Sequence, residues 1–308
     1  MKLQTPVTDA ACKVGISYKD RITMLGSCFS DNIGNQLVDL GFDVCVNPFG
    51  TLYNPVSILK SVERLISGEK FTEKDCIQIG AGDERFCSFS HHTSFARKTA
   101  EEFVENANNA LENARMHFAQ STKVIITLGT SWCFRNNGSG EVVSNCLKRL
   151  PGEFTRERLS AIETTACLCR IMELCRMAEG MEMAQHIEFV PKQFIFTVSP
   201  IRHFKDGAHG NQISKGALLL GIDDFLHGCP EDLGMHPHQS ADYFPAYEIM
   251  MDELRDYRFY AEDMCHPSQQ AVEYIRERFL AWALPACEHP RLEENIREFK
   301  RRSHIRPA

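Results

Sequence analysis

Short apolar runs alternate with longer helical stretches along this chain, and this alternation constrains the fold more than any other feature. The clearest runs, Lys123–Leu128 and Gln193–Val198, are rich in β-branched and aromatic residues, as buried strands are. Strands that alternate with helices of this length imply parallel strands joined by helical crossovers. We therefore expect an α/β sandwich with an open central sheet. The other expected strands are 22–25, 42–46 and 257–261, and the expected helices are 30–40, 55–66, 99–120, 154–183, 211–225, 241–254 and 268–282.

The length of 308 residues allows one large domain or two small ones. No Gly/Ser-rich linker divides the chain, so we expect a single domain over residues 1–284. Two segments are expected to be irregular insertions, one at about 77–95, which could hold a hairpin, and one at about 226–240. Residues 285–308 are charged and are expected to form a C-terminal extension, either a solvated helix or a tail.

The charge balance excludes several classes of partner. Lys and Arg number 34 and Asp and Glu 41, which gives a formal net charge of −7. Because nucleic acids and anionic membranes are bound by basic surfaces, neither is an expected partner.

The 13 cysteines are scattered and odd in number, which is typical of reduced thiols rather than of a disulfide framework. The N-terminus holds no apolar leader and no run is long enough to span a membrane, so we expect a cytoplasmic protein.

Each expected strand is followed by a tight turn with a polar or nucleophilic side chain, and sites in such sheets form at the carboxyl ends of strands. Cys28 is the most interesting of these side chains, because it lies between the first strand and the helix that starts near Ser30. Backbone N–H groups at a helix N-terminus stabilise a thiolate, lower its pKa and can donate hydrogen bonds to a developing oxyanion. The alternative is that Cys28 is a small buried apolar residue, as most free cysteines are.

A candidate base follows the last expected strand, in Asp263-x-x-His266-Pro267. An aspartate three residues before a histidine can reach its Nδ1 and orient the ring, which leaves Nε2 to face a nucleophile. The alternative is that Asp263 caps the following helix and that His266 is a surface residue.

The segment Gly26-Ser27-Cys28-Phe29-Ser30 resembles the signature of the GSCFA-domain family, and the resemblance spans residues 25–282. That family is grouped with the SGNH/GDSL hydrolases, which are three-layer α/β/α sandwiches with a central, mainly parallel sheet and which cleave or transfer acyl esters. The resemblance therefore implies this fold and acyl-transfer chemistry. The further segments that resemble the family are 47–55, 126–132, 197–203 and 243–267.

By this resemblance, Cys28 takes the place of the serine nucleophile in the first SGNH block, and a register shift of one residue would put Ser27 there instead. The second block implies Gly50 as an oxyanion donor through its N–H. Asp263 and His266 match the last block, in which Asp-x-x-His supplies the base. A cysteine at this position is chemically competent, since a thiolate is the stronger nucleophile near neutral pH.

The chain departs from the third SGNH block, which is Gly-x-Asn-Asp. Gly129 is kept, but Ser131 stands where the asparagine amide would donate to the oxyanion. The loss of such a donor costs about 3 kcal/mol of barrier in a comparable case. Ser131 or Thr130 could supply a hydroxyl donor, or Asn54 could reach in from the neighbouring loop, and the sequence leaves these alternatives open.

Further polar residues flank the expected site. Arg202 and His203 follow the fourth strand and would bind an anionic or carbonyl group, or else form a surface pair beside a turn. Of His91 and His92, one is expected to face the pocket, with His92 as the candidate, and the other to be structural. No metal is expected, because the histidines and cysteine at 227–229 and 236–238 match no common zinc spacing.

The sequence predicts an acyl-ester hydrolase or acyltransferase. Cys28 would attack the carbonyl of a small-molecule or carbohydrate acyl ester, His266 would take the thiol proton, and Asp263 would orient His266. The acyl-enzyme would pass its acyl group to water or an acceptor hydroxyl, with acetyl-CoA as a candidate donor and no other cofactor. The alternative is a non-catalytic module that binds a small molecule or glycan on the same fold. A thiol redox protein is disfavoured, because the sequence holds no Cys-x-x-Cys.

Overall fold

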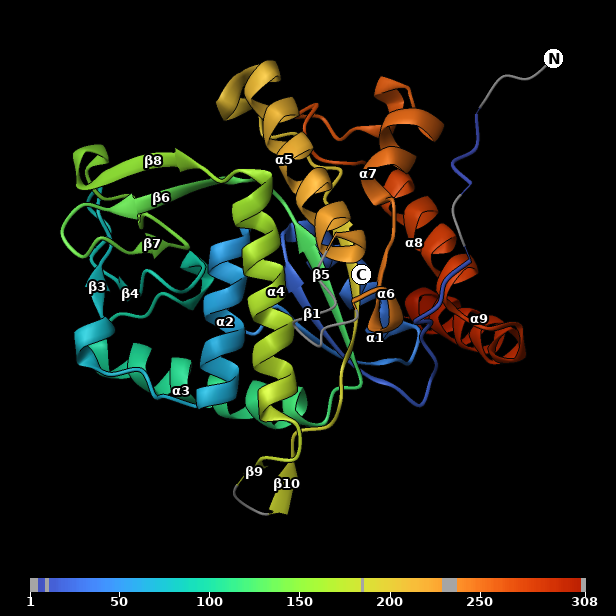
Figure 1. The fold of residues 1–308 in the computed structure, drawn as a ribbon, viewed down its shortest axis with the longest axis horizontal. Helices are drawn as coiled ribbons and strands as arrows, with labels where there is room; N and C mark the ends of the chain where they lie inside the picture. Colours follow the sequence, from blue (N-terminus) through green and yellow to red (C-terminus); the bar gives the residue numbers. More distant parts are fainter. Residues whose placement is uncertain (1–4, 9–10, 184–185, 229–236, 306–308) are drawn as a thin grey trace.

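The computed structural model describes residues 5–8, 11–183, 186–228 and 237–305. At its centre lies a five-stranded sheet with the order β12-β11-β5-β1-β2, in which every neighbouring pair is parallel (Figure 1). The central strand β5 is buried along its whole length, as its β-branched sequence predicts. The strands are β1 (Arg21–Gly26), β2 (Asp43–Val46), β5 (Lys123–Leu128), β11 (Gln193–Val198) and β12 (Ala241–Tyr243).

Helices cover both faces of this sheet, which makes three layers (Figure 1). Alternate residues of a strand point to opposite faces, so Leu25 and Ile126 enter one core while Met24 and Ile125 enter the other. The expected α/β/α sandwich with a central parallel sheet is therefore confirmed. The first face carries α2 (Pro55–Ser67), α3 (Ala100–Ala119), α4 (Ala161–Ala178) and α5 (Gly207–His227), and the second carries α1 (Cys28–Asp39) and α8 (Gln269–Ala283).

Three small antiparallel sheets lie outside the main sheet, two of them beside α2 and one below α4 in the view of Figure 1. One is the hairpin expected within 77–95, which is confirmed. A second contains the turn around Gly138 and joins the end of β5 to the start of α4. Their strands are β3 (Ile77–Gln78) with β4 (Phe86–Cys87), β6 (Trp132–Asn136) with β7 (Val142–Val143) and β8 (Phe154–Arg158), and β9 (Glu182–Met183) with β10 (Ile187–Glu188).

The expectation of one helix over 154–183 is wrong at both ends, because α4 ends at Ala178 and Glu182–Met183 is the strand β9. Residues 154–158 form β8, which pairs along its whole length with β6, so tertiary pairing overrides the helix preference of its Arg and Glu residues. A capping box then starts α4: Ser160 Oγ accepts the N–H of Glu163, and the Glu163 carboxylate accepts the N–H of Ser160. This Ser-x-x-Glu motif is the signal in the sequence that marks the boundary.

The fifth strand of the main sheet also differs from the expected one. It is β12, which lies in the segment 241–254 that was expected to be helical, and it pairs with Phe194–Phe196 of β11. A strand of three residues is too short to show the alternation by which a strand is recognised in a sequence. The helical part of the segment is reduced to α7 (Ala246–Glu248) and a wider π-helical turn over Ile249–Glu253.

The strand expected at 257–261 is wrong. Tyr257–Phe259 forms a 3₁₀ turn, because Asp256 accepts the N–H of Arg258 through its side chain and so starts a turn. Only an isolated antiparallel bridge between Tyr260 and Pro267 remains of the extended pairing in this segment. That bridge closes the loop 261–266, which carries the candidate base.

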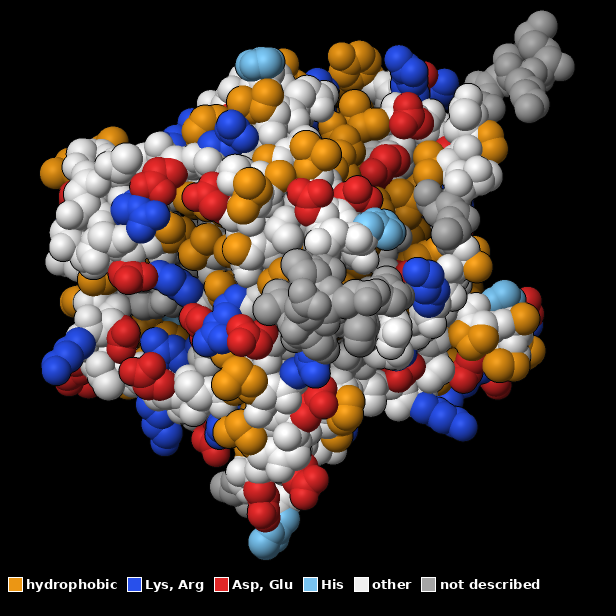
Figure 2. All heavy atoms as spheres, in the orientation of Figure 1, with side chains coloured by type: hydrophobic (Ala, Val, Ile, Leu, Met, Phe, Trp, Pro, Cys, Tyr) orange, Lys and Arg blue, Asp and Glu red, His pale blue; other side chains and the backbone are white. Residues whose placement is uncertain are grey.

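The C-terminal extension forms α9 (His289–Ile305), which packs on the second face, where Asn295 Nδ2 donates to the carbonyl of Leu40 at 2.7 Å. On the face of the molecule in Figure 2, acidic and basic side chains are interspersed. Across the residues the structure describes, no helix has both the length and the apolar character that crossing a bilayer requires.

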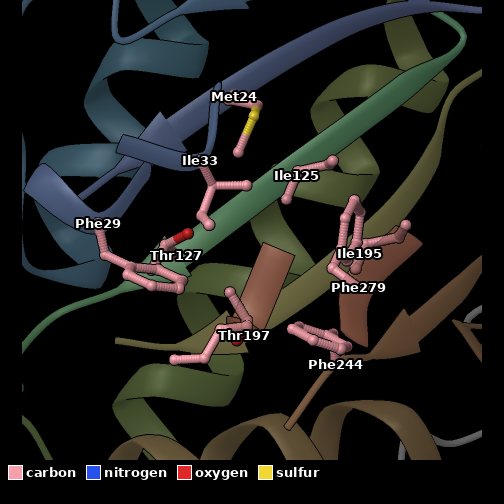
Figure 3. A pocket seen from close by; sticks show the side chains of 10 residues that line it. Met24, Phe29, Ile33, Ile125, Thr127, Ile195, Thr197, Phe244 and Phe279 are labelled. Carbon is pink, nitrogen blue, oxygen red and sulfur yellow. The ribbon is translucent and has the colours of Figure 1, made fainter. Parts of the chain in front are cut away.

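A small apolar cavity lies between the sheet and the helices of the second face (Figure 3). Its volume, about 20 Å³, is enough for one water molecule and too small for an acyl chain. Phe29 and Ile33 of α1 line it, together with two threonines. Thr127 accepts a hydrogen bond from Ser30 at 2.7 Å, whereas the Thr197 hydroxyl has no partner within the described residues. The core behind the start of α1 is therefore apolar and leaves little empty space.

Candidate functional site

Strand β1 delivers Ser27 and Cys28 to the carboxyl edge of the sheet. It ends at Gly26, where φ is 143° and a Cβ would collide with the carbonyl group of Thr127. Ser27 is fully buried and caps α1, because its Oγ accepts the N–H of Phe29 at 3.3 Å. Cys28 is the first residue of α1 and is partly exposed. Of the two candidate nucleophiles, Cys28 is therefore the more exposed.

The surroundings of the Cys28 thiol raise its pKa. Burial is the largest cause, and the nearby Asp31 carboxylate adds to it. The N–H groups of Cys28 and Phe29 and the ammonium group of Lys215 act in the opposite direction but do not prevail. The expected lowering of this pKa by the helix N-terminus is therefore outweighed. Cys28 is a thiol at neutral pH and needs a base to become a nucleophile.

Asp263 and His266 form the expected pair. The Oδ2 atom of Asp263 lies 2.5 Å from Nδ1 of His266, while Oδ1 accepts the N–H groups of Cys265 and His266, each at 2.9 Å. These bonds lower the pKa of Asp263 to about 2, with the N–H of His266 as the largest cause. Helix α8 has its own cap, since Ser268 accepts the N–H of Ala271. The role of Asp263 is thus to hold the His266 ring rather than to cap the helix.

His203 is influenced both by Lys215, which neighbours Cys28, and by His266. No hydrogen bond joins Cys28 to His266 in the described part of the chain, but the pKa of His203 responds to the charges of both Lys215 and His266. Burial is the main reason that this pKa is lowered to about 3, so the ring is neutral at pH 7. Its Nε2 is buried and has no partner within the described residues, and its ring centroid lies 6.1 Å from that of Tyr53.

Lys215 is a site residue that the sequence analysis missed. It comes from α5 and is 1% exposed, and its Nζ donates to the carbonyls of Gly129 at 2.6 Å and Ser199 at 2.7 Å. Burial lowers its pKa to about 7, while the neighbouring Cys28 acts to raise it. The sequence holds a signal, because Asn211, Ser214, Lys215 and Leu218 share one buried helical face, and a lysine there calls for explanation.

The side chains of Thr130 and Ser131 are bound to α5. Ser214 Oγ accepts the N–H of Ser131 at 2.8 Å and lies 2.9 Å from Thr130 Oγ1 and 3.2 Å from Ser131 Oγ. Both residues are buried, and their hydroxyl groups hold the turn after β5 against the helix. A role for either hydroxyl in binding an oxyanion would require these bonds to be exchanged.

The other two expected donors are also engaged. The N–H of Gly50 donates to the carbonyl of Asn47 at 2.8 Å, in a turn where Gly50 has a φ of 80° and a Cβ would collide with His92. The Oδ1 of Asn54 accepts the N–H of Ser57 at 2.9 Å and so caps α2. In this conformation the N–H of Gly50 is committed to its own turn, and the oxygen of Asn54 serves the helix.

Asn47 joins the turn after β2 to the turn after β1, and the sequence analysis did not select it. Its Oδ1 accepts the N–H of Gly26 at 2.8 Å, and its Nδ2 donates to Asp31 Oδ1 at 2.6 Å. Burial raises the pKa of Asp31, whereas Asn47 and the nearby His92 lower it. Asn47 has a left-handed φ of 40°, a conformation that asparagine adopts more readily than most residues.

Of the two adjacent histidines, His92 is the one beside the site. It is partly exposed, lies against Gly50, and its Nδ1 is 3.1 Å from Ser94 Oγ. His91 is fully buried, its Nδ1 lies 2.7 Å from Ser88 Oγ, and burial lowers its pKa to about 3. The rings that surround His91 are those of Phe49, Phe71, Phe95 and Phe103.

Arg202 is bonded to the loop that carries the base. Its N–H donates to the carbonyl of Cys265 at 3.0 Å, and its Nη1 donates to the carbonyl of Met264 at 3.2 Å. Its guanidinium carbon lies 4.1 Å from the ring centroid of Phe204. Arg202 thus contacts the site loop, while the N–H of His203 donates to Asn211 Oδ1 at 3.0 Å, so the two residues are more than a surface pair beside a turn.

The described residues contain no cluster of three or more His, Cys, Asp or Glu side chains that could hold a metal ion. The histidine and cysteine motifs at 227–229 and 236–238 lie largely outside the described residues. The titratable groups at the site include a thiol, two imidazoles, a carboxylate and a buried ammonium group.

The fold and the site define an α/β/α sandwich protein with a thiol at one helix start and a histidine–aspartate pair on a neighbouring loop of the same sheet edge. The sequence profile of the GSCFA family matches residues 21–279, which include Cys28, Lys215, Asp263 and His266. The chain belongs to the GSCFA family. Comparisons with curated proteins and with solved structures give no match.

Proposed function

We propose that this protein is an acyl hydrolase or acyltransferase of the SGNH type that works through a thioester on Cys28. The observation that carries the proposal is the 2.5 Å contact between Asp263 Oδ2 and His266 Nδ1. With Nδ1 held by Asp263, Nε2 is the nitrogen of His266 that remains to accept a proton. A nucleophile, a base and a group that orients the base are the parts that acyl transfer requires.

In the first step, His266 Nε2 takes the proton of the Cys28 thiol, and the sulfur attacks the carbonyl carbon of the acyl ester. The bond between that carbon and the alcohol oxygen breaks, and the alcohol leaves with the proton from His266. In the second step, water or an acceptor hydroxyl attacks the thioester, its proton passes to His266, and the Cys28 sulfur leaves. The N–H of Cys28, at the start of α1, would donate to the oxyanion.

The proposal requires the loop 261–266 to approach the thiol when substrate binds, because Cys28 and His266 make no hydrogen bond in the described structure. Catalytic hydrogen bonds are often formed only in the substrate complex. The side chains of His266 and Asp263 are 51% and 50% exposed, so neither is fixed by packing on all sides. Lys215 supplies the positive charge that favours the thiolate once the proton has left.

The proposed substrate is a small-molecule or carbohydrate ester with a short acyl group, and acetyl-CoA is a candidate donor. The cavity behind Phe29, at about 20 Å³, offers no room for a long acyl chain. The steps above use no metal and no other cofactor. The odd number of scattered cysteines, which is typical of reduced thiols, is the reason that we propose a cytoplasmic location.

A non-catalytic binding module is the second candidate. The observation that favours it is that the Gly50 N–H and the Ser131 hydroxyl are both engaged within the protein, which leaves fewer oxyanion donors than an SGNH hydrolase uses. Such a module would bind a small molecule or glycan at the same edge of the sheet without forming an acyl-enzyme.

Intact-mass spectrometry after incubation with p-nitrophenyl acetate distinguishes the two candidates. The proposed enzyme gains one acetyl group in the wild type and none in Cys28→Ala. Cys287→Ala is the matched control, because Cys287 is an exposed cysteine in the C-terminal segment, and it should label like the wild type. Absence of an adduct in the wild type, or an adduct retained in Cys28→Ala, would favour the binding module or a different nucleophile.

A further inference from the structure

Beside the loop of Asp263 and His266 lies a hollow that the proposed chemistry does not use. Its volume of about 180 Å³ is below the roughly 300–1,000 Å³ of pockets that enclose a whole drug-sized ligand, so it suits one group of a larger molecule. We name it the Arg202 pocket. Its lining includes Arg202, Met250, Met251, Arg255, Tyr257 and Tyr260.

The guanidinium group of Arg202 is held against aromatic rings in this pocket before any ligand binds. Its carbon lies 4.1 Å from the ring centroid of Phe204 and 5.2 Å from that of Tyr260. Its Nη1 donates to the carbonyl of Met264, in the loop that carries the candidate base, while the other N–H groups of the guanidinium have no partner in the described residues. These contacts hold the Arg202 side chain in place, and the pocket adjoins the proposed reaction centre.

The charge of the Arg202 pocket is not neutralised. Neither Arg202 nor Arg255 forms an ion pair with another described residue, and the one lining carboxylate, Asp256, is bonded to Arg258 at 2.9 Å. Two guanidinium groups without carboxylate partners fit a phosphate, which arginine binds through paired N–H donors. A neutral sugar would need hydrogen-bond acceptors, and the only lining carboxylate is already engaged.

Exposed apolar side chains lie around Arg202. Tyr257 is 66% exposed, and Phe204 and Met264 are 37% and 48% exposed. Large apolar side chains that cluster at the surface around a charged hollow are typical of a binding site. Tyr257 offers a ring face on which a planar group could stack.

We propose that the Arg202 pocket binds the phosphorylated nucleotide end of the acyl donor, with a phosphate on Arg202 and Arg255 and the base against Tyr257. This inference rests on the proposed function, because it names the donor of that same site as a nucleotide thioester. The donor's thioester would then extend from the pocket past Met264 toward the Asp263–His266 pair.

Titration calorimetry with adenosine 3′,5′-bisphosphate, a probe that carries no acyl group, tests the pocket. We expect the wild type to bind it, and both Arg255→Gln and Tyr257→Ala to weaken binding tenfold or more. Both side chains are exposed, so these variants should fold. Arg170→Gln, which alters an exposed arginine on α4, is the matched control and should bind like the wild type.

Adenosine and inorganic phosphate, titrated separately, should each bind at least tenfold more weakly than the bisphosphate. Lack of binding by the wild type, equal binding by Arg255→Gln, or equal binding of inorganic phosphate would overturn the assignment. Acetylation of Cys28 by p-nitrophenyl acetate needs no nucleotide. Acetylation of Cys28 without nucleotide binding would therefore overturn the assignment of the Arg202 pocket and leave the proposed function standing. Nucleotide binding without acetylation would overturn the proposed function and leave the pocket as a nucleotide site.

Discussion

The side-chain nitrogen of Lys215 lies 2.6 Å from the carbonyl oxygen of Gly129, at the end of the central strand. Gly129 also lies against Ser27, so this bond puts a buried cation beside the turn that presents Cys28. The partners of the lysine are backbone carbonyls, and no carboxylate in the described residues offsets its charge. Because a buried ammonium group is costly to desolvate, its presence here points to a role in the site rather than in stability.

Replacing Lys215 with methionine removes this cation while keeping a side chain of similar length. The pKa of Cys28 should then rise further, because the group that favours its thiolate is gone. A rise of one pKa unit would slow alkylation by iodoacetamide about tenfold at neutral pH. The pH profile of Cys28 alkylation, followed by mass spectrometry, measures this shift directly.

Lys192→Met is the matched control for that experiment. Lys192 is also a buried lysine bonded to backbone carbonyls, those of Ala119, Ser121 and Val190, but it precedes β11 and so lies at the opposite edge of the sheet. If both variants slow the alkylation of Cys28 equally, Lys215 acts through general packing and not through its charge.

Lys215 should also make stability depend on pH. Burial lowers its pKa from 10.5 to about 7 in the folded protein, so between these values the unfolded chain binds more protons. The destabilisation is fully present below about pH 7 and is lost as the pH rises, by at most about 1.4 kcal/mol per pH unit. Urea unfolding between about pH 6 and 9 should show this rise, and a smaller one in Lys215→Met. An unchanged slope in the variant would contradict the account.

Asp263→Asn tests the orientation of His266. An amide cannot hold the ring as the carboxylate does, so turnover of p-nitrophenyl acetate should fall by about 10² to 10⁴, with little change in melting temperature. The pKa of Asp263, lowered to about 2, keeps the carboxylate ionised at any pH above about 4, so it should not shape the pH profile. Asp223→Asn is the control, since Asp223 forms a similar exposed pair with His227. Equal losses in both variants would refute the role.

Gly26→Ala tests the turn that presents the thiol. At this residue a Cβ would meet the Thr127 carbonyl in a backbone conformation that glycine favours. We expect a loss of about 2–4 kcal/mol in the free energy of unfolding, measured with urea. Gly82→Ala, where φ is 78° and nothing lies within 4 Å, separates backbone strain from collision and should cost about 1 kcal/mol.

The sequence predicts the parts of the fold that have long and regular patterns. Residues 123–128 and 193–198 are the strands β5 and β11, because apolar runs rich in β-branched and aromatic residues suit the centre of a parallel sheet. The sequence fails to predict the strand at 154–158, where Arg and Glu favour a helix, and the strand at 241–243, which has three residues. Both strands depend on pairing with partners distant in the chain. A strand as short as β12 has too few residues for its hydrophobic pattern to distinguish it from a helix.

The candidate site likewise has contacts that the sequence predicts and contacts that it does not. The contact between Asp263 and His266 spans three residues, so local spacing is enough to predict it. The contacts of Lys215 with Gly129 and of Asn47 with Gly26 join segments that only the folded sheet brings together. A polar residue on a buried helical face, as at Lys215, is the one local sign of such a contact.

The most direct test of the central claim is the chemistry of the acyl-enzyme bond itself. After acetylation by p-nitrophenyl acetate, the wild-type adduct should be released by neutral hydroxylamine, because it is a thioester, and a Cys28→Ser adduct should resist, because it is an oxygen ester. Release from the wild type with resistance in Cys28→Ser would establish that the acyl group passes through the sulfur of Cys28. A wild-type adduct that resists hydroxylamine and persists in Cys28→Ala would place the acyl group elsewhere, with Ser27 as the first alternative, and would contradict the account.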